Sequence, residues 1–359
     1  MEEFLLKQNL KNKMRFYYIS VNNSYPQNRH LIDGLRENGH KVFEYEERAL
    51  GIDKYIKIVK NFWPQKHLYD VVIVGFTSPH FVPIMRLMTS KKIIYNGGFS
   101  QYEANVISKY TNKKISIRAF IWWFKDFVSF LLSSKILLES NSQINYIHKL
   151  FFVPRKKLIR AWAGVDEKEF FIDKSIEKNK KFTVLFRGRF LPESGILTVV
   201  KTAKLLENED IDFLLIGHGF LHREYRELID KLKPKNFRLI SKKISYKELQ
   251  EKMLGCHISL GQLANHPRLY RTLPCKLFES LALGLPYLTG RNASVLELLK
   301  ENETCIAVEP ANPNELAEKI LYLKNNPKIL EKIAEQGYKL YKEKLTSKKL
   351  AEDFIKKCL

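Results

Sequence analysis

The sequence predicts an α/β protein built from two doubly wound, Rossmann-like domains. Short apolar segments alternate with helical patterns along nearly all of the 359 residues, as is typical of parallel sheets covered by helices. At ~100–200 residues per domain, this length suits two domains. A polar, lysine-rich stretch at residues 172–181 interrupts the alternation and indicates a linker. We therefore expect two similar halves that face each other across a cleft.

The first domain is expected to cover residues 1–172. It begins with a strand, a helix that ends at Gly39 and a second strand, which together form one βαβ unit. Three further apolar segments continue the pattern. The expected elements are the strand Arg15–Val21, the helix Asn28–Asn38, and the strands Lys41–Tyr45, Val71–Gly75, Lys92–Asn96 and Lys135–Ser140.

The second domain is expected to cover residues 173–341. Six apolar segments, each followed by a helical pattern, predict another doubly wound sheet. Residues 326–359 have the pattern of two helices with lysines on the outer face. The expected strands are Phe182–Phe186, Asp212–Ile216, Phe237–Ile240, His257–Leu260, Pro286–Thr289 and Cys305–Val308.

Composition excludes several classes of protein. With 45% hydrophobic residues the chain can bury a core, so it is not disordered. The four cysteines have neither zinc-site nor disulfide spacing, which favours a reducing, cytoplasmic setting without a bound metal or other cofactor. The first residues lack the basic and apolar regions of a secretory signal. Lys and Arg number 61 against 39 Asp and Glu, a net charge of +22.

The most apolar segment is residues 118–132, RAFIWWFKDFVSFLL. Lys125 and Asp126 interrupt it, and it is shorter than the ~20 residues of a membrane-spanning helix. It is either a covering helix of the first domain or an interfacial helix, since tryptophan at this density suits a membrane surface. Combined with the positive charge, it predicts peripheral, salt-sensitive binding to the anionic inner face of the cell membrane.

Polar residues follow two strands of the second domain. In open α/β sheets ligands bind outside the carboxyl ends of the strands. Arg187, Gly188 and Arg189 follow one strand, and arginine makes bidentate contacts to phosphate. Gly217 and His218 follow the next strand, where glycine permits a tight turn close to a ligand. The alternatives are surface ion pairs for the arginines and a plain strand-to-helix turn for the glycine motif.

The segment Tyr270–Gly290, YRTLPCKLFESLALGLPYLTG, carries the densest chemistry. Lys276 and Glu279 are spaced i, i+3 and share one face of a helix that Pro274 starts. A carboxylate at this place can accept hydrogen bonds from a ribose diol, and Arg271 with Lys276 can neutralise a diphosphate. The alternative is a surface Lys–Glu helix pair.

At this segment the chain resembles glycosyltransferase family 4, retaining sugar-nucleotide enzymes of the GT-B fold. Glu279 fits the second glutamate of the family's usual pair, while Arg271 stands in place of the first, an R-x-x-P-x-K-x-x-E form. Ser194 stands where the family commonly has a lysine. The matching segments are AGVDEKEFF, FRGRFLPESG, FLLIGHG, LPCKLFESLALGLPYLTG, ASVLELL and AVEPANPNELAEKI.

The resemblance implies a retaining hexosyltransferase that moves a sugar from a nucleoside diphosphate sugar to a lipid-linked or envelope glycan acceptor. It implies that the first domain binds the acceptor, the second binds the donor, and a helix at about 342–359 packs back on the first domain. No metal is expected, because cations can stabilise the leaving diphosphate. The implied residues are Arg189 and Lys276 for catalysis; Arg187, Gly188, Gly217, His218, Arg271, Glu279 and Glu297 for the donor; and Asn96, Gly97 and Glu103 facing the acceptor or sugar.

Two other functions remain open from the sequence. A GT-B sugar-nucleotide epimerase would interconvert or hydrolyse the sugar nucleotide without an acceptor. A basic nucleic-acid-binding protein would account for the net charge. However, the sequence has no aromatic RNA-binding strand signature, no zinc-finger spacing and no basic region joined to heptads.

Overall fold

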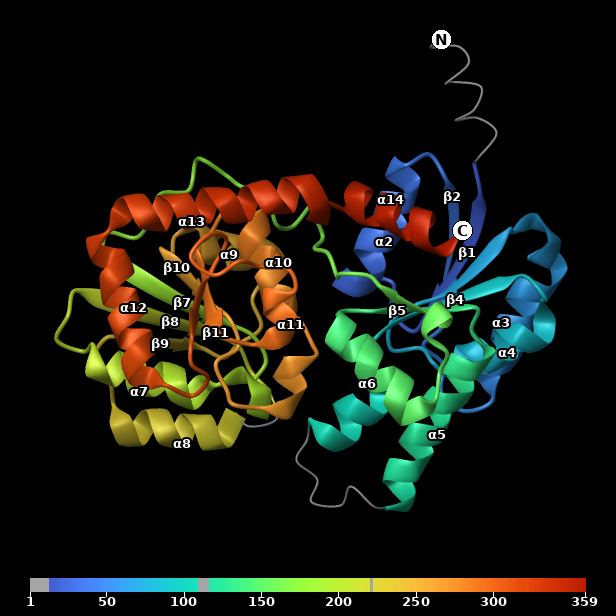
Figure 1. Ribbon diagram of the computed structural model, residues 1–359, viewed down its shortest axis with the longest axis horizontal. Helices are drawn as coiled ribbons and strands as arrows, with labels where there is room; N and C mark the ends of the chain where they lie inside the picture. Colours follow the sequence, from blue (N-terminus) through green and yellow to red (C-terminus); the bar gives the residue numbers. More distant parts are fainter. Residues whose placement is uncertain (1–12, 109–115, 220–221) are drawn as a thin grey trace, which may run out of the picture. The chain divides into compact units, whose positions relative to one another are not determined.

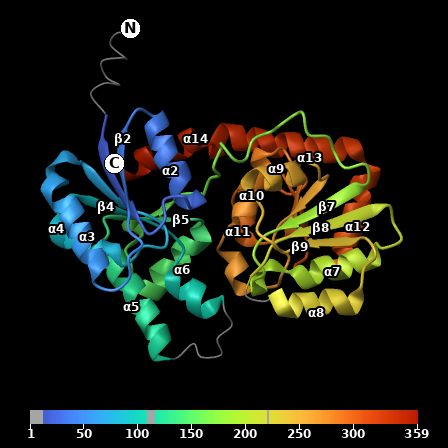
Figure 2. The same cartoon turned by 180° about the vertical axis from the view of Figure 1, so that it is seen from behind.

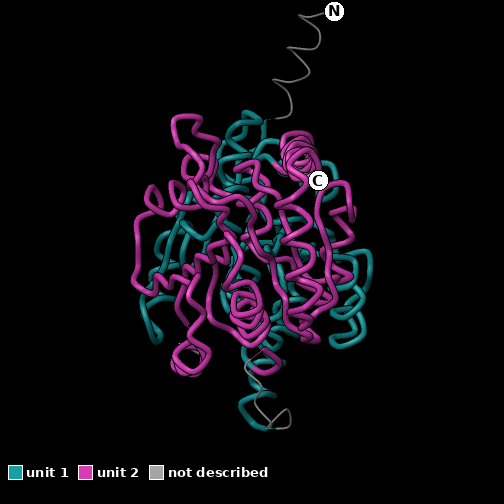
Figure 3. Tube along the Cα trace, turned by 90° about the vertical axis from the view of Figure 1, so that its left-hand side faces the viewer, with its two compact units in different colours: residues 1–105, 113–164, 346–359 teal, residues 106–112, 165–345 magenta. Residues whose placement is uncertain are grey.

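The computed structural model describes residues 13–108, 116–219 and 222–359. The chain forms two compact units (Figure 3). The first comprises Met1–Asn105, Lys113–Gly164 and Thr346–Leu359, and the second Val106–Asn112 and Val165–Leu345. The first boundary therefore falls at residue 164 instead of the expected 172, and the returning segment starts at 346 instead of about 342. The described residues 106–108 belong to the second unit, which the sequence did not predict.

The first unit is built on a six-stranded parallel sheet (Figure 1). Its strand order is β2-β1-β3-β4-β5-β6, so the order reverses between β1 and β3. All five predicted strands of this half are present, and the sequence analysis missed the three-residue β6. The strands are β1 Arg15–Ser20, β2 Lys41–Glu46, β3 Val71–Val74, β4 Lys92–Gly98, β5 Lys135–Leu138 and β6 Leu158–Arg160.

Alternating strand residues explain why these strands are apolar throughout. Phe16 and Tyr18 pack into one core with α2 and α14, whereas Tyr17 and Ile19 pack into another with α3 to α6. Side chains of a strand point to opposite faces, so a sheet covered on both sides needs apolar residues at every position. The helices are α2 Pro26–Glu37, α3 Asp53–Phe62, α4 Phe81–Met88, α5 Ile117–Leu132, α6 Asn141–Phe151 and α14 Ser347–Cys358.

The C-terminal helix α14 belongs to the first unit and lies against α2 (Figures 1 and 2). Ala351 and Phe354 are buried in the core that this pair covers. The two helices approach very closely, because a Cβ atom on Gly34 would lie 2.0 Å from the Ser347 carbonyl oxygen. A glycine at this position of α2 is therefore what allows α14 to dock.

The second unit has its own six-stranded parallel sheet, in the order β12-β11-β10-β7-β8-β9. Helices lie on both of its faces (Figures 1 and 2). Each predicted strand is present, so the predicted α/β class with two parallel sheets is confirmed. The strands are β7 Phe182–Arg187, β8 Ile211–Ile216, β9 Phe237–Ile240, β10 Ile258–Leu260, β11 Tyr287–Gly290 and β12 Ile306–Val308.

The helices of the second unit follow its strands in the predicted alternation. They are α7 Ile196–Leu205, α8 His222–Leu232, α9 Tyr246–Leu254, α10 Cys275–Ala282, α11 Ala293–Leu296, α12 Pro313–Asn325 and α13 Pro327–Leu340. Within the described residues, none of the helices in either unit is both long enough and apolar enough to cross a bilayer.

Candidate functional site

The strand order of the second unit marks where a ligand is expected. Successive strands run outward from β7 to β8 and β9, and the chain then crosses back so that β10 pairs with the other side of β7. Such a reversal opens a crevice at the carboxyl ends of the two central strands. Arg187 and Gly188 lie at this end of β7, and Gln262 follows the same end of β10.

Lys276, in the first turn of α10, reaches this switch point. Its Nζ donates a hydrogen bond to Gln262 Oε1 at 3.3 Å and lies 3.5 Å from the centroid of the Phe186 ring. A Cβ atom on Gly188 would lie 3.1 Å from the same Nζ, so a larger residue there would crowd the ammonium group. Only 4% of Lys276 is exposed. The predicted surface Lys–Glu pair is thus wrong for Lys276, whose charge is held inside the fold.

Glu279 lies one turn further along α10 and is also buried. Its Oε2 atom lies 2.9 Å from Nη1 of Arg187, which forms an ion pair. This contact is not a hydrogen bond, and Oε2 accepts none from the described part of the chain. A buried carboxylate oxygen without a donor is costly. Binding of a hydroxyl group here would relieve that cost.

The electrostatics of this cluster favour an anion. Burial lowers the pKa of Lys276 well below its usual value, neighbouring Arg187 lowers it further, and Glu279 opposes the shift. Burial raises the pKa of Glu279, against the effect of Arg187 and Lys276. Two cations thus share one buried carboxylate. A bound diphosphate would add the negative charge that the pair of cations lacks.

Two glycines bring the loop after β8 against the loop after β7. A Cβ atom on Gly217 would lie 1.8 Å from the Gly188 carbonyl oxygen, and one on Gly219 would lie 2.7 Å from the Phe190 nitrogen. The backbone nitrogen of Phe190 donates to the carbonyl of His218 at 2.9 Å. The glycine motif is therefore needed for backbone packing, which positions the Arg187–Arg189 loop. The His218 side chain is exposed.

Ser194 stabilises that loop from the other side. Its Oγ donates to the Arg189 carbonyl at 2.6 Å and accepts from the Leu191 nitrogen at 3.2 Å. The side chain is buried. At the place of the family's lysine, this chain therefore has a residue that fixes the loop. Arg189 itself is exposed, and in the described residues no carboxylate pairs with its side chain.

Two other predicted donor residues, Arg271 and Glu297, come from elements other than β7 and α10. Arg271 is partly exposed and directly follows the short helix η5 Pro267–Tyr270, whereas Glu297 is partly exposed and directly follows α11. Gln262 and Phe186, by contrast, contact Lys276 and were not predicted. Their position at the ends of the two strands flanking the reversal is the signal that could have found them.

The predicted sugar-facing residues of the first unit occupy packed positions. Asn96 donates through Nδ2 to the Gln27 carbonyl at 2.7 Å and to the Tyr18 hydroxyl at 3.3 Å. Gly97 lies beside the Tyr95 ring. Glu103 is fully buried and accepts a hydrogen bond from Gln143 at 2.8 Å. The carboxylate of Glu103 is hydrogen-bonded inside the fold, and its contact with the acceptor or sugar stays a prediction.

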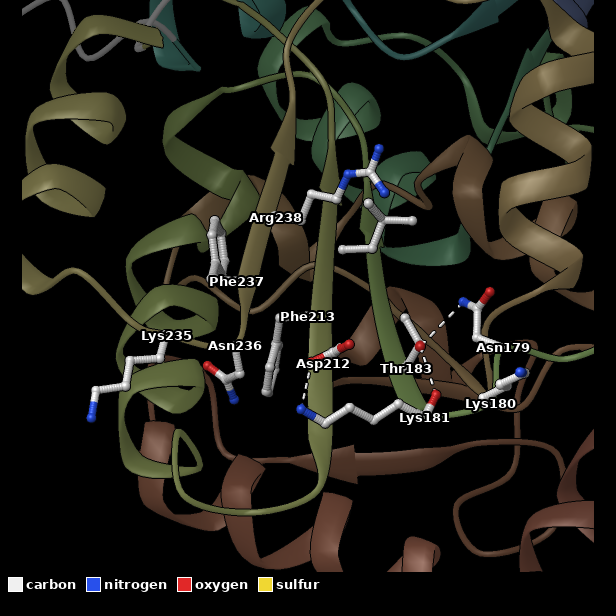
Figure 4. Close-up of a pocket in the computed structure, with 11 residues that line it drawn as sticks. Asn179, Lys180, Lys181, Thr183, Asp212, Phe213, Lys235, Asn236, Phe237 and Arg238 are labelled. Carbon is white, nitrogen blue, oxygen red and sulfur yellow. Dashed lines mark hydrogen bonds and ion pairs between the residues drawn. The ribbon is translucent and has the colours of Figure 1, made fainter.

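The groove in Figure 4 lies at the opposite edge of the second sheet. It is lined by residues at the amino ends of β7, β8 and β9, where the strand-end rule does not place a ligand. Lys181 spans it to pair with Asp212 at 2.8 Å, and Asn179 donates to Thr183 at 3.1 Å. Lys235 points away from the other labelled side chains. We therefore place no donor site in this groove.

Comparison with known proteins identifies the family. Residues 167–340 match the family described as "Glycosyl transferases group 1". These residues, just under half of the chain, belong to this family. The resemblance inferred from the sequence is thereby confirmed, whereas the R-x-x-P-x-K-x-x-E variant stays a prediction.

A relative of this group 1 chain is an uncharacterized glycosyltransferase of Methanocaldococcus jannaschii. It is 26% identical over 159 residues, which cover 44% of this chain and 43% of the relative. Alpha-D-kanosaminyltransferase of Streptomyces kanamyceticus is 25% identical over 156 residues, covering 43% of this chain and 39% of that protein. The match thus spans about two fifths of the length of these curated relatives.

Solved structures match this group 1 chain over nearly its full length. Sucrose-phosphate synthase from Thermosynechococcus elongatus aligns with a TM-score of 0.75 and 15% identity, covering 96% of this chain and 98% of that one. HepE from Anabaena, solved in complex with UDP-glucose, aligns with a TM-score of 0.69 and 12% identity, covering 96% and 99%. These likenesses establish the GT-B fold.

Proposed function

We propose that the protein is a retaining glycosyltransferase that takes a hexosyl group from a UDP-sugar. The observation that carries this proposal is the cluster of partly exposed Arg187 with buried Lys276 and Glu279 at the switch point of the second sheet. Family membership supports the reaction type, and UDP-glucose in HepE supports the choice of donor. We assign the donor to the second unit and the acceptor to the first.

Each residue of the cluster has a proposed role. Lys276 and Arg189 bind the diphosphate, and Arg187 bridges it to Glu279. Glu279 accepts hydrogen bonds from the ribose hydroxyls through Oε2, which has an ion-pair contact with Arg187 but no hydrogen bond in the described part of the chain. Gly188, next to the Lys276 ammonium, leaves room for a phosphate group to approach. His218, Arg271 and Glu297 stay proposals for the rim of the same site.

The proposed reaction proceeds on one face of the sugar. The bond from the anomeric carbon to the diphosphate oxygen breaks, and a bond from the same carbon to the acceptor oxygen forms on that face. The acceptor's proton passes to the leaving diphosphate. Lys276 and Arg189 stabilise the charge that develops there, which is the largest catalytic contribution expected of fixed cations.

We further propose that the acceptor is a lipid-linked or envelope glycan at the inner face of the cell membrane. The apolar and basic surface of the first unit supports this assignment. An epimerase is the alternative within enzymes, and it would act on the sugar nucleotide with no acceptor present.

Transfer by wild type and variants tests the proposed function. UDP-glucose is incubated with a membrane glycan fraction, and released UDP and the anomeric configuration of the product are measured. We expect acceptor-dependent release with retained configuration, unchanged by a chelator. Arg189→Ala should lose at least tenfold in rate, since one charged hydrogen bond is worth about 1.5–3 kcal/mol.

Arg238→Ala is the matched control, because Arg238 is an exposed arginine of the same unit that lines the groove of Figure 4. It should transfer at the wild-type rate. Equal losses in both variants, or sugar interconversion without acceptor, would contradict the proposal.

A further inference from the structure

Helix α5 is apolar on its outward face as well as on the face that packs into the core. Its buried face includes Phe130 together with Asp126 and Ser129. Its outward face carries Ile117, Phe120, Ile121, Phe124, Val128 and Leu131, at the spacing of one helical stripe. Ile117 is 82% exposed, Phe120 61% and Phe124 50%. We call these six residues the α5 stripe. It was open from the sequence whether they were buried, and the structure exposes five of them and leaves Val128 partly exposed.

A third exposed aromatic residue lies at the end of α6, which packs against α5. Phe152, at the end of α6, is 80% exposed and has a φ of 55°, a backbone conformation that ordinarily favours glycine or asparagine. The end of α6 is fixed against α5, because Trp123 stacks on Phe151 at 5.7 Å and donates to the Leu150 carbonyl. The apolar surface therefore extends from α5 onto the end of α6.

The segment of the sequence that carries the stripe is rich in positive charge. Between Val71 and Val165 the sequence has fourteen Lys and Arg residues and three acidic residues. The three acids are Glu103, Asp126 and Glu139, and all are buried. This segment thus holds eleven of the 22 net positive charges of the chain. Lys157 donates to the Leu131 carbonyl at 2.7 Å, which places a cation at the end of the stripe.

We propose that the α5 stripe and Phe152 form a docking surface for an anionic lipid bilayer. Exposed aromatic and aliphatic side chains enter the interface, and the flanking cations contact anionic headgroups. A second copy of the chain is a poor occupant, because two such surfaces would place like charges opposite each other. Nucleic acid offers no apolar partner for Ile117, Ile121 and Leu131. This docking surface rests on the proposed function at one point, which is that the acceptor of the glycosyl transfer is bound to a membrane.

Co-sedimentation with vesicles tests this surface without donor or acceptor. We expect wild type to bind vesicles of equal parts phosphatidylglycerol and phosphatidylcholine, to release at high salt, and not to bind phosphatidylcholine alone. The double variant Phe120→Ser with Phe124→Ser should lose at least tenfold in partition coefficient. Leu197→Ser with Leu205→Ser is the matched control, since these residues of α7 are 43% and 54% exposed. It should bind like wild type.

Two further variants separate the contribution of charge from that of the apolar side chains, and the membrane surface from the donor site. Arg118→Gln with Lys125→Gln, which leaves every apolar residue in place, should also weaken binding to anionic vesicles. Glu279→Ala should bind vesicles normally, so failure of the donor site and failure of this surface can be told apart. The proposal would be overturned if wild type bound neutral and anionic vesicles equally, or bound neither kind. It would also be overturned if both double variants of α5 bound like wild type, or if wild type formed a dimer that the Phe120/Phe124 variant dissociates.

Discussion

At the scale of single residues, the main feature is the burial of the Lys276 side chain in the protein without ligand. Lys276 has its pKa lowered by burial and by Arg187. Burying a charge with incomplete compensation costs stability. Such a cost is common where a side chain is kept for binding an opposite charge. Binding of a diphosphate, the role proposed for Lys276, would offset this cost.

This lowered pKa predicts how donor affinity depends on pH. A bound diphosphate favours the charged ammonium, so binding takes up a proton once the pH exceeds the pKa of Lys276 in the free protein. The dissociation constant for UDP-glucose should then rise by up to about tenfold per pH unit. In Lys276→Arg the slope should vanish, because arginine stays protonated.

Calorimetric titration at a series of pH values above neutral measures both slopes. The assignment of the diphosphate to Lys276 would fail if wild type showed no slope, or if the arginine variant kept the same one.

The sequence could predict the residue types of the site but not their burial. The i, i+3 spacing places Lys276 and Glu279 on one face of α10, and that is local information. Whether that face meets solvent depends on β7 and β10, which are far away in the chain. The same limitation affects Glu103, which lies in a loop by sequence but is buried against Gln143.

At the scale of elements, the loops after β7 and β8 act as one unit. Gly217 has no room for a Cβ atom, because the Gly188 carbonyl would be 1.8 Å away. Gly217→Ala should therefore displace the Arg187–Arg189 loop, lower stability by ~1–3 kcal/mol and weaken UDP binding. Thermal unfolding should show a loss of about 2–4 °C per kcal/mol for a unit of this size.

Gly255→Ala is the control for that experiment. Gly255 is the C-cap of α9, and the nearest atom to its added Cβ would be the flexible Asn179 side chain at 3.1 Å. We expect wild-type affinity for UDP. A Gly217→Ala variant with the stability and the UDP affinity of wild type would contradict the role given to the close packing of the two loops.

The long strands were easier to predict from the sequence than the short strand β6 and the exposed face of α5. The central strands are apolar because both faces are covered, and this pattern is visible in the sequence. β6 has three residues, too few for a periodic signal. The exposure of the apolar outer face of α5 was not predictable either, because a helix that is apolar on both sides has the same composition whether or not its outer side is covered.

At the scale of the whole molecule, the two units have similar parallel sheets but different residues at their switch points. In the second unit the switch point is lined by Arg187, buried Lys276 and buried Glu279. In the first unit the corresponding position, between β1 and β3, is filled by Asn28, which accepts hydrogen bonds from the Phe76 nitrogen and the Tyr18 hydroxyl at 2.7 and 2.8 Å. This difference supports the assignment of the donor to the second unit.

The two-sheet architecture was predictable from the alternation of strands and helices in the sequence. The residues at each switch point were not, because they depend on which strands become neighbours.

Titration of UDP into wild type and Glu279→Ala tests the central claim most directly. The matched control is Glu301→Ala, because Glu301 pairs with Arg291 at 2.7 Å in the same unit but away from the switch point. We predict that wild type and Glu301→Ala bind UDP equally, and that Glu279→Ala loses at least tenfold, about 1.4 kcal/mol, with the fold intact. Wild-type affinity in Glu279→Ala, or an equal loss in Glu301→Ala, would contradict a donor site at the Arg187–Lys276–Glu279 cluster.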